Sequence, residues 1–203
     1  MANFEYGQKE KEHLRRRDKR LGKAIDRLGP LECEVSPDLF PTLINSIVAQ
    51  QISGKAAETV WGRVKERFIE ITPQRLAAVQ VEEIQACGMS MRKATYIKGM
   101  AEACAKGDLD LDGLKLLPDQ EVVARLSALR GIGAWTAEMI LIFSLQRPDV
   151  VSWNDLAIRR GMMILYGLDQ LTRDRFDQHR KRYSPYGSVA SLYLWEISHE
   201  PTE

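Results

Sequence analysis

The sequence predicts an all-α protein. Apolar residues recur at helical spacing along almost the whole chain, and no segment shows the sustained alternation of apolar and polar residues that marks a half-buried strand. The composition is that of an ordinary globular protein, because 44% of the 203 residues are hydrophobic and 28% are charged. The chain is therefore long enough for one domain or for two small ones.

Each predicted helix rests on a local pattern. In the first, Leu14, Leu21 and Ile25 recur seven and four residues apart, which places them on one face. Prolines open two helices, because the first turn of a helix needs no N–H from proline, and a glycine closes another. The helices are expected over residues 12–28, 39–52, 55–70, 91–106, 134–145, 155–166, 172–181 and 188–198, with shorter ones beginning at Pro73 and Pro118.

Composition excludes several classes of protein. The first twenty residues hold no apolar stretch of a signal peptide, and no segment reaches the roughly 18 apolar residues of a membrane span. We expect a soluble intracellular protein, cytoplasmic and associated with the nucleoid in a bacterium, or nuclear in a eukaryote. No C-x-x-C or H-x-x-x-H pair is present, so neither zinc nor an iron–sulfur cluster is expected. The chain holds three cysteines and three histidines, all widely spaced: Cys33, Cys87, Cys104, His13, His179 and His199.

The net charge is only +1, but basic residues cluster in two places. Residues 9–23 hold eight Lys or Arg against three acids, and residues 172–183 hold five against two. Such clusters are typical of a surface that binds nucleic acid. The alternative is a solvated helix face, which is the more common reason for a run of charged residues.

The segment LRGIG, residues 129–133, joins two predicted helices. Gly131 and Gly133 allow a tight turn and a close approach of the backbone to another group. A helix that begins just after the second glycine presents unpaired N–H groups and the positive end of its dipole, which together favour a phosphate. The alternative is a tight connection without a ligand. A similar but weaker pattern, a glycine turn followed by an amphipathic helix, recurs over residues 88–101.

Two acids follow this region, and local sequence gives each a structural interpretation. Ser152-x-x-Asp155 fits a capping box, with Asp155 in the first turn of the next helix. Asp149 follows Pro148 and is expected in a loop. From the local pattern alone, Asp155 is a capping residue.

Taken together, these motifs resemble the helix-hairpin-helix superfamily of DNA repair glycosylases, from about residue 20 to 198. The resemblance implies an endonuclease III-like fold with two lobes and a DNA cleft between them. Residues 36–146 would form a six-helix lobe that ends in the helix-hairpin-helix, and residues 1–35 with 147–203 a second lobe that carries the catalytic aspartate. The matching segments are 43–64, 88–101, 118–145, 150–162 and 185–195.

Trp135 distinguishes branches of that superfamily. Bifunctional members have a nucleophilic lysine two residues after the second glycine, and tryptophan cannot form the Schiff base. The iron–sulfur cysteines of other branches are also missing. The chain therefore resembles a short form of the 3-methyladenine DNA glycosylase II group. The resemblance implies a monomer that excises 3-methyladenine or 7-methylguanine from damaged double-stranded DNA without AP-lyase activity or a required cofactor.

The resemblance also assigns site residues. An alkylated purine is positively charged, and an aromatic face binds such a base by cation–π attraction worth roughly 0.5–2 kcal/mol. Asp155, twenty residues after Trp135, would be the catalytic acid that stabilises a developing oxocarbenium ion or positions water. The candidate pocket aromatics are Trp135, Trp61, Trp153, Tyr183, Tyr186 and Trp195, and packing in the core is the alternative for each.

Further residues would contact DNA. A flipped-out base leaves a gap, which Gln50 or Gln51 would fill. The backbone carbonyls of Ser127, Leu129 and Gly131 would bind a monovalent cation, Na⁺ or K⁺, beside a DNA phosphate. The other proposed DNA contacts are Gly131, Gly133, Ala134, Thr136, Arg159 and, one position further, Arg160.

Three other functions remain compatible with the sequence. The same fold could serve a uracil or mismatch DNA glycosylase, whose pocket would need hydrogen-bonding groups for a neutral base. The chain could also be a non-catalytic helix-hairpin-helix module that binds DNA with strong salt dependence. An all-α protein-interaction domain is the third.

Overall fold

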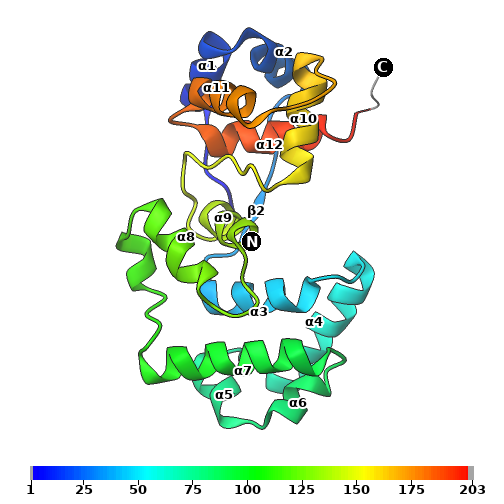
Figure 1. Cartoon of the computed structure of the whole chain (residues 1–203), viewed down its shortest axis with the longest axis vertical. Coiled ribbons are helices and arrows are strands. Elements are labelled where there is room, and N and C mark those ends of the chain that lie inside the picture. The colour runs from blue at the N-terminus through cyan, green and yellow to red at the C-terminus, as the bar shows by residue number, and fades with distance from the viewer. Residues whose placement is uncertain (1, 201–203) are drawn as a thin grey trace. The chain divides into compact units, whose positions relative to one another are not determined.

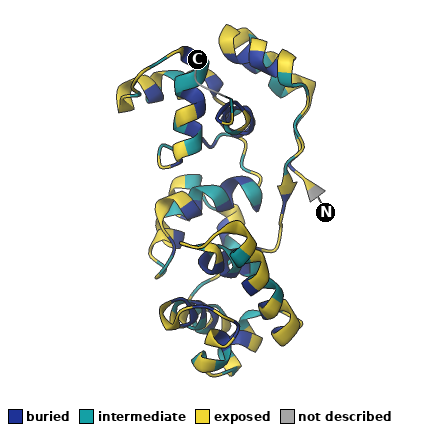
Figure 2. Ribbon diagram, turned by 90° about the vertical axis from the view of Figure 1, so that its right-hand side faces the viewer, coloured by how far each residue is buried: buried dark blue, intermediate teal, exposed yellow. Residues whose placement is uncertain are grey.

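The computed structural model describes residues 2–200 and confirms the all-helical fold (Figure 1). This part of the chain forms twelve α-helices, a 3₁₀ helix and one antiparallel pairing of two-residue strands, β1 (Ala2–Asn3) with β2 (Glu34–Val35). The sequence does not predict the strand pair, because two residues cannot show an alternating pattern. None of the helices in residues 2–200 is long and apolar enough to cross a membrane. Exposed and buried residues share individual helices, as amphipathic patterns require (Figure 2).

The chain divides into two compact units. Unit 2 is the continuous stretch Ser36–Ile140, and unit 1 combines Met1–Val35 with Leu141–Glu203. The division falls inside α9 (Ala134–Phe143), the helix that follows the LRGIG hairpin.

Unit 1 is built around α12, whose residues are almost all buried. α10 packs directly against it, because Gly161 lets the two helices approach so closely that a Cβ atom would clash with the Leu194 carbonyl oxygen. α10, which begins just after Asp155, is thereby fixed to the core of the unit. The helices of unit 1 are α1 (Gln8–Arg17), α2 (Lys19–Leu28), α10 (Leu156–Tyr166), α11 (Arg173–Tyr183) and α12 (Gly187–Ile197).

Unit 2 is organised by α7, which packs against α3, α5 and α6. Three side-chain hydroxyls start its helices: Ser53, Thr72 and Ser90 accept backbone N–H groups at the beginnings of α4, α5 and α7. The elements are α3 (Leu39–Ala49), α4 (Gly54–Phe68), α5 (Pro73–Ala78), α6 (Val81–Gln85), α7 (Met91–Lys106), η1 (Gly113–Leu116), α8 (Asp119–Ser127) and most of α9.

The single helix predicted over residues 12–28 is wrong, because Asp18 divides it into α1 and α2. The buried Asp18 carboxylate caps α2 by accepting N–H groups of Arg20 and Leu21, both at 3.0 Å. Its second oxygen accepts from the hydroxyl of Tyr166 at 2.7 Å and from Arg182 at 3.2 Å. α1 therefore ends at a residue whose partners, Tyr166 and Arg182, lie 148 and 164 residues further along the chain. No local sequence pattern reveals such partners.

Candidate nucleic-acid interface and active site

The hairpin between α8 and α9 requires its first glycine. Gly131 has a left-handed backbone, with φ +90°, and the buried Ile132 donates from its N–H to the carbonyl oxygen of Leu129 at 3.1 Å. The ring of Tyr96 covers Gly131 so closely that a Cβ atom would lie 2.6 Å from Cδ2 of the ring. Conformation and space both disfavour a side chain at this position.

The second glycine has different surroundings. Gly133 is exposed, and a Cβ atom there would meet no described atom outside its immediate neighbourhood in the chain within 4 Å. Its carbonyl oxygen accepts from the N–H of Ala137 at 3.0 Å and so begins α9, with Ala134 exposed and Thr136 buried. The first N–H groups of a helix lack intrahelical partners and carry the positive end of the dipole. This helix start can therefore receive an anion that approaches over Gly133.

The two candidate plug residues lie just past the end of α3 and differ in their contacts. The side-chain amide of Gln50 donates to the carbonyl oxygen of Gly131 at 2.6 Å, which ties the end of α3 to the hairpin. Gln51 is exposed and has a left-handed backbone, with φ 56°, which is uncommon outside glycine. The predicted helix over 39–52 consequently stops at Ala49.

A buried lysine holds the same helix end, and sequence reasoning missed it. Lys93 is 9% exposed, and its ammonium group donates to the carbonyl oxygens of Val48 at 2.8 Å and Gln50 at 2.6 Å. Burial, together with the nearby charge of Arg92, lowers the pKa of Lys93. In the sequence, Lys93 is simply one more charged residue of an amphipathic helix.

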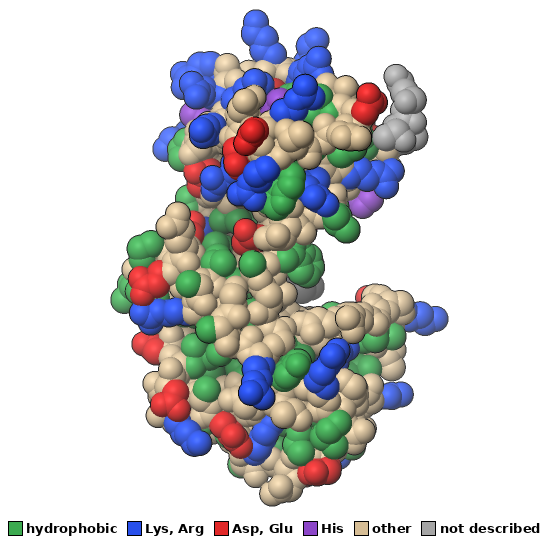
Figure 3. Space-filling model, viewed as in Figure 1, with side chains coloured by type: hydrophobic (Ala, Val, Ile, Leu, Met, Phe, Trp, Pro, Cys, Tyr) green, Lys and Arg blue, Asp and Glu red, His purple; other side chains and the backbone are tan. Residues whose placement is uncertain are grey.

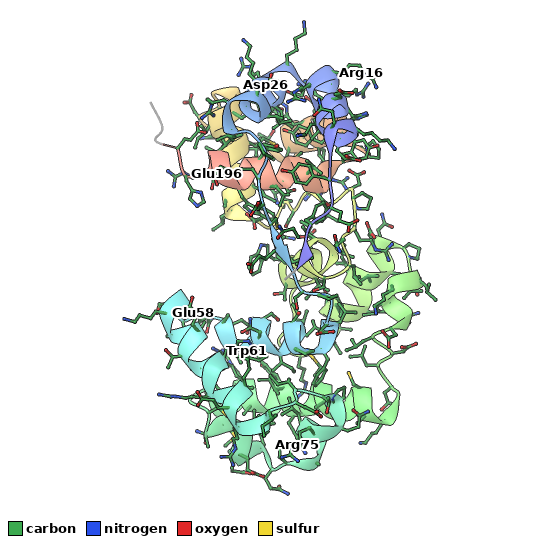
Figure 4. All side chains as sticks on the ribbon, turned by 180° about the vertical axis from the view of Figure 1, so that it is seen from behind. Arg16, Asp26, Glu58, Trp61, Arg75 and Glu196 are labelled. Carbon is green, nitrogen blue, oxygen red and sulfur yellow. The ribbon has the colours of Figure 1, made fainter. Side chains whose placement is uncertain are left out.

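Two of the candidate aromatics belong to unit 2. Trp135 is the second residue of α9 and is 47% exposed, which is unusual for so large an apolar side chain. Trp61 lies on α4 and is half-buried (Figure 4). Trp135 thus presents an accessible ring directly after the hairpin.

Asp155, in unit 1, is itself the N-cap of α10. Its Oδ1 accepts from the N–H of Ile158 at 2.8 Å, and the residue is 6% exposed. The predicted register, with Ser152 as the cap and Asp155 in the first turn, is therefore wrong. The helix end orients the carboxylate and its dipole favours negative charge. Because a carboxylate can accept several hydrogen bonds, capping is compatible with a chemical role.

Asp149, also in unit 1, connects two loops through hydrogen bonds. Its carboxylate accepts from the Ser184 hydroxyl at 2.5 Å and from the N–H of Gly187 at 3.0 Å. These contacts fasten the loop before α10 to the start of α12. This arrangement supports the interpretation of Asp149 as a loop residue.

Tyr183 does not line a pocket in unit 1. It is fully buried, and its hydroxyl is 2.8 Å from that of Tyr166, which donates to Asp18. Burial raises the pKa of both tyrosines. The prediction that Tyr183 contacts a base is therefore wrong, because its ring has no exposed face.

Trp153 is also engaged within unit 1. The guanidinium carbons of Arg159 and Arg173 lie 5.0 and 5.3 Å from the centre of its ring, and Phe176 meets it edge-on at 5.2 Å. These cations already occupy the ring as a charged base would. These contacts favour packing within unit 1 as the role of Trp153, with Arg159 lying against its ring.

The last two aromatics pack against neighbours as well. Tyr186 meets the ring of His13 edge-on, with the centroids 5.1 Å apart. Trp195 stacks on Phe143 at 5.3 Å. Both contacts fit the core-packing alternative.

The carbonyl groups proposed for a cation belong to the end of α8 and the hairpin. The Leu129 oxygen accepts from Ile132 and the Gly131 oxygen from Gln50, while Ser127 is the last residue of α8. A carbonyl oxygen has two lone pairs, so these bonds leave acceptor capacity for a cation. Among residues 2–200, no group of three or more His, Cys, Asp or Glu could hold a metal ion.

The two basic clusters of the sequence meet in unit 1, where α1 and α11 pack together. Lysines and arginines gather over this end of the unit (Figure 3). Part of the charge is compensated, because Arg15 pairs with Asp26 and Arg173 with Asp177. These pairs fit the interpretation of solvated helix faces.

Comparison with known proteins gives consistent matches. Residues 44–185 match the model of the HhH-GPD superfamily base excision DNA repair proteins. The chain is 34% identical over 187 residues to DNA-3-methyladenine glycosylase 1 of Schizosaccharomyces pombe, covering 89% of this chain and 81% of the relative.

Solved structures resemble the fold over nearly the whole chain. A DNA-3-methyladenine glycosidase from Bacillus halodurans superposes with a TM-score of 0.89 at 36% identity, covering 98% of this chain and 93% of the other. A 3-methyladenine DNA glycosylase from Schizosaccharomyces pombe, in complex with abasic DNA, gives a TM-score of 0.80 at 31% identity, covering 97% and 99%.

Proposed function

Because the chain belongs to the HhH-GPD superfamily of base excision DNA repair proteins, we propose that it is a monofunctional DNA glycosylase that removes alkylated purines from damaged duplex DNA. Its substrates would be 3-methyladenine and 7-methylguanine. The observation that carries the proposal is the likeness, along nearly the whole chain, to proteins named as 3-methyladenine glycosylases. The local geometries of Trp135 and Asp155 support it.

Unit 2 binds the DNA backbone in this proposal. A phosphate approaches the start of α9 over Gly133, where the absence of a side chain leaves space and the positive end of the helix dipole favours an anion.

A monovalent cation would strengthen this contact. Held by the carbonyl oxygens of Ser127, Leu129 and Gly131, it would add positive charge beside the phosphate. Replacing K⁺ and Na⁺ in the buffer with a bulky organic cation, at constant ionic strength, should then weaken binding to abasic DNA.

Gln51 fills the gap that the flipped nucleotide leaves. Its side chain is exposed at the tip of the loop after α3, whereas the Gln50 side chain is bound to the hairpin. An amide can form hydrogen bonds with the unpaired base of the opposite strand. The contacts therefore favour Gln51 over Gln50, a choice that the sequence leaves open.

Trp135 stacks on the damaged base. Alkylation at N3 or N7 gives the purine a positive charge, and an indole ring attracts a cation over its face. The accessible ring of Trp135 suits this role without any base-specific hydrogen bond. A normal purine is neutral and gains less from the same contact.

Asp155 acts on the sugar. The bond from C1′ to the purine nitrogen breaks and its electron pair leaves with the base, which neutralises the positive charge of the alkylated ring. The oxocarbenium character that develops on the sugar is stabilised by the carboxylate, and water then forms the new bond to C1′ and loses a proton. The cap contact with Ile158 holds the carboxylate in a fixed orientation for this step.

Strand cleavage requires an amine nucleophile, and Trp135 supplies none. We therefore expect an intact abasic strand as the product. Borohydride traps the Schiff base of a lyase, so treatment of the enzyme with borohydride and substrate should leave no covalent protein–DNA product.

The test is release of free base from methylated duplex DNA, separated by chromatography, with uracil-containing duplex as the parallel substrate. Release of 3-methyladenine, with uracil untouched, is the expected result. Release of uracil alone would contradict the substrate class. Release from neither, with abasic DNA still bound, would contradict the enzymatic function and favour a non-catalytic module.

A further inference from the structure

Two lysines of α7 bind the ends of two other helices in unit 2. Lys93 donates to the carbonyl oxygens of Val48 and Gln50 at the end of α3. Lys98 donates to those of Ala77, at 2.5 Å, and Val79, at 2.7 Å, at the end of α5. The last carbonyl groups of a helix lack intrahelical partners and carry the negative end of the dipole, so both contacts stabilise a helix terminus.

The end of α3 leads directly into an unusual turn. The Gln50 carbonyl belongs to the peptide group that joins Gln50 to Gln51, so the ammonium group of Lys93 fixes the orientation of that peptide group 2.6 Å away. Gln51 then takes its left-handed backbone conformation, which few residues other than glycine adopt unaided. Lys93 is therefore bound directly beside the turn that exposes Gln51.

The same face of α7 also supports the hairpin. Tyr96 is three residues after Lys93, so the two side chains are neighbours on the helix. The Tyr96 ring covers Gly131, and the Gln50 side chain bonds to the carbonyl oxygen of Gly131. Lys93, Gln50 and the hairpin thus form one connected set of contacts within unit 2.

We propose that Lys93 is a positioning residue for DNA binding and base removal, because it fixes the peptide group that aims Gln51 at the DNA. This inference rests on the proposed function. Lys93 touches no DNA in this proposal, since its ammonium group is buried against two backbone carbonyls. Its effect on turnover passes through Gln51.

The test compares Lys93→Met with Lys98→Met. Each variant removes an ammonium group from α7 and leaves two carbonyl groups at a helix end without it, so each should lower the midpoint of thermal unfolding. The comparison is made at a temperature where both variants are folded. The measurements are the Kd for abasic duplex DNA and the single-turnover rate of base release.

We expect Lys93→Met to lose about 10- to 100-fold in single-turnover rate, the loss typical of a small misplacement at a site. The Kd for abasic DNA should rise as well, whereas Lys98→Met should stay within about twofold of wild type in both measurements. Lys93→Arg should recover most of the activity. A cavity of about 360 Å³ lined by Val48, Gln51 and Lys93 gives room for the larger group.

A double-mutant cycle decides whether Lys93 acts through Gln51. In a Gln51→Ala background, Lys93→Met should cause little further loss, because the side chain that it positions is gone. Equal losses for Lys93→Met and Lys98→Met, or full additivity with Gln51→Ala, would overturn the inference. Absence of base release by wild type would instead overturn the proposed function, and the abasic-DNA affinities of the same variants would still decide the role of Lys93.

Discussion

The side-chain amide of Gln50 and the carbonyl oxygen of Gly131 are 2.6 Å apart and form a hydrogen bond that joins two loops 81 residues apart in the chain. The loop after α3 and the helix-hairpin-helix are thereby fixed to each other within unit 2. Both loops belong to the candidate interface. A substitution that breaks this hydrogen bond should therefore affect both of them.

Gln50→Ala should destabilise the protein, whereas Gln51→Ala should not. Removal of the Gln50 amide leaves the Gly131 carbonyl without this donor, at a cost of about 1 kcal/mol. The exposed Gln51 should change the free energy of unfolding by less than about 0.5 kcal/mol while weakening binding to abasic DNA. Urea unfolding and fluorescence anisotropy measure the two effects. Destabilisation by Gln51→Ala of the same size would argue against the separate roles.

The two hairpin glycines form a matched pair. Gly131→Ala combines a left-handed backbone with a contact to the Tyr96 ring, and we expect a loss of about 1–3 kcal/mol in the free energy of unfolding. Gly133→Ala places its methyl group in open space and should leave stability nearly unchanged. It should nevertheless reduce DNA affinity, because the methyl group stands where the phosphate approaches. Unchanged affinity in the Gly133 variant would exclude this approach.

Asp155→Asn separates capping from chemistry. Asparagine is as good an N-cap as aspartate, so the midpoint of thermal unfolding should stay close to that of wild type. Base release should fall by about 10²–10³-fold, the size expected when a group that stabilises the transition state is lost. Asp155→Ala should lose activity and also about 1 kcal/mol of stability. Normal turnover by the asparagine variant would remove Asp155 from the reaction.

The stability of unit 1 should depend on pH through His179. Its ring stacks on Tyr166 at 3.7 Å, and burial, followed by the charge of Arg182, lowers the pKa of His179 below its ordinary value of 6.5. Asp18 acts in the opposite direction, and Arg175 and Arg20 add to the lowering. As the pH falls, His179 therefore binds a proton in the unfolded chain before it does so in the folded protein. The free energy of unfolding should then decrease as the pH drops below about 6.5.

His179→Phe tests this dependence, because phenylalanine keeps the stack on Tyr166 and cannot titrate. Urea unfolding of wild type and variant at a series of pH values between about 7.5 and 5 gives the two slopes. The variant should show the shallower decline, with His13 and His199 present in both proteins. Equal slopes would assign the pH dependence to other groups.

The helices that the sequence predicts best are those whose ends are marked locally. α7 spans Met91–Lys106 as predicted, because the Ser90 hydroxyl caps its start and Gly107 adopts the left-handed conformation at its end. The tight turn at Gly131 is confirmed for the same reason: its positive φ is a property of glycine itself.

Contacts between distant segments account for the failures. α1 stops at Asp18 because Tyr166 and Arg182 bind its carboxylate, and α3 stops at Ala49 because Lys93 and the hairpin hold Gln50. Among the candidate site residues, tyrosine gives the same signal in a core as in a pocket, so only its burial removes Tyr183. Lys93 cannot be identified from the sequence, because only its contacts in the folded protein distinguish a buried lysine from an exposed one.

The interrupted connectivity of unit 1 has a consequence for synthesis on the ribosome. Leu21 and Ile25 of α2 are fully buried in a core that α10 and α12 complete, and those helices are translated only after the whole of unit 2. At roughly 5–20 residues per second, the apolar side of α2 waits about ten to thirty seconds for its partners. Unit 2, being continuous, can fold during that interval. Nascent chains halted before α12 should therefore expose α2 to chaperones and proteases while α3 to α8 are already protected.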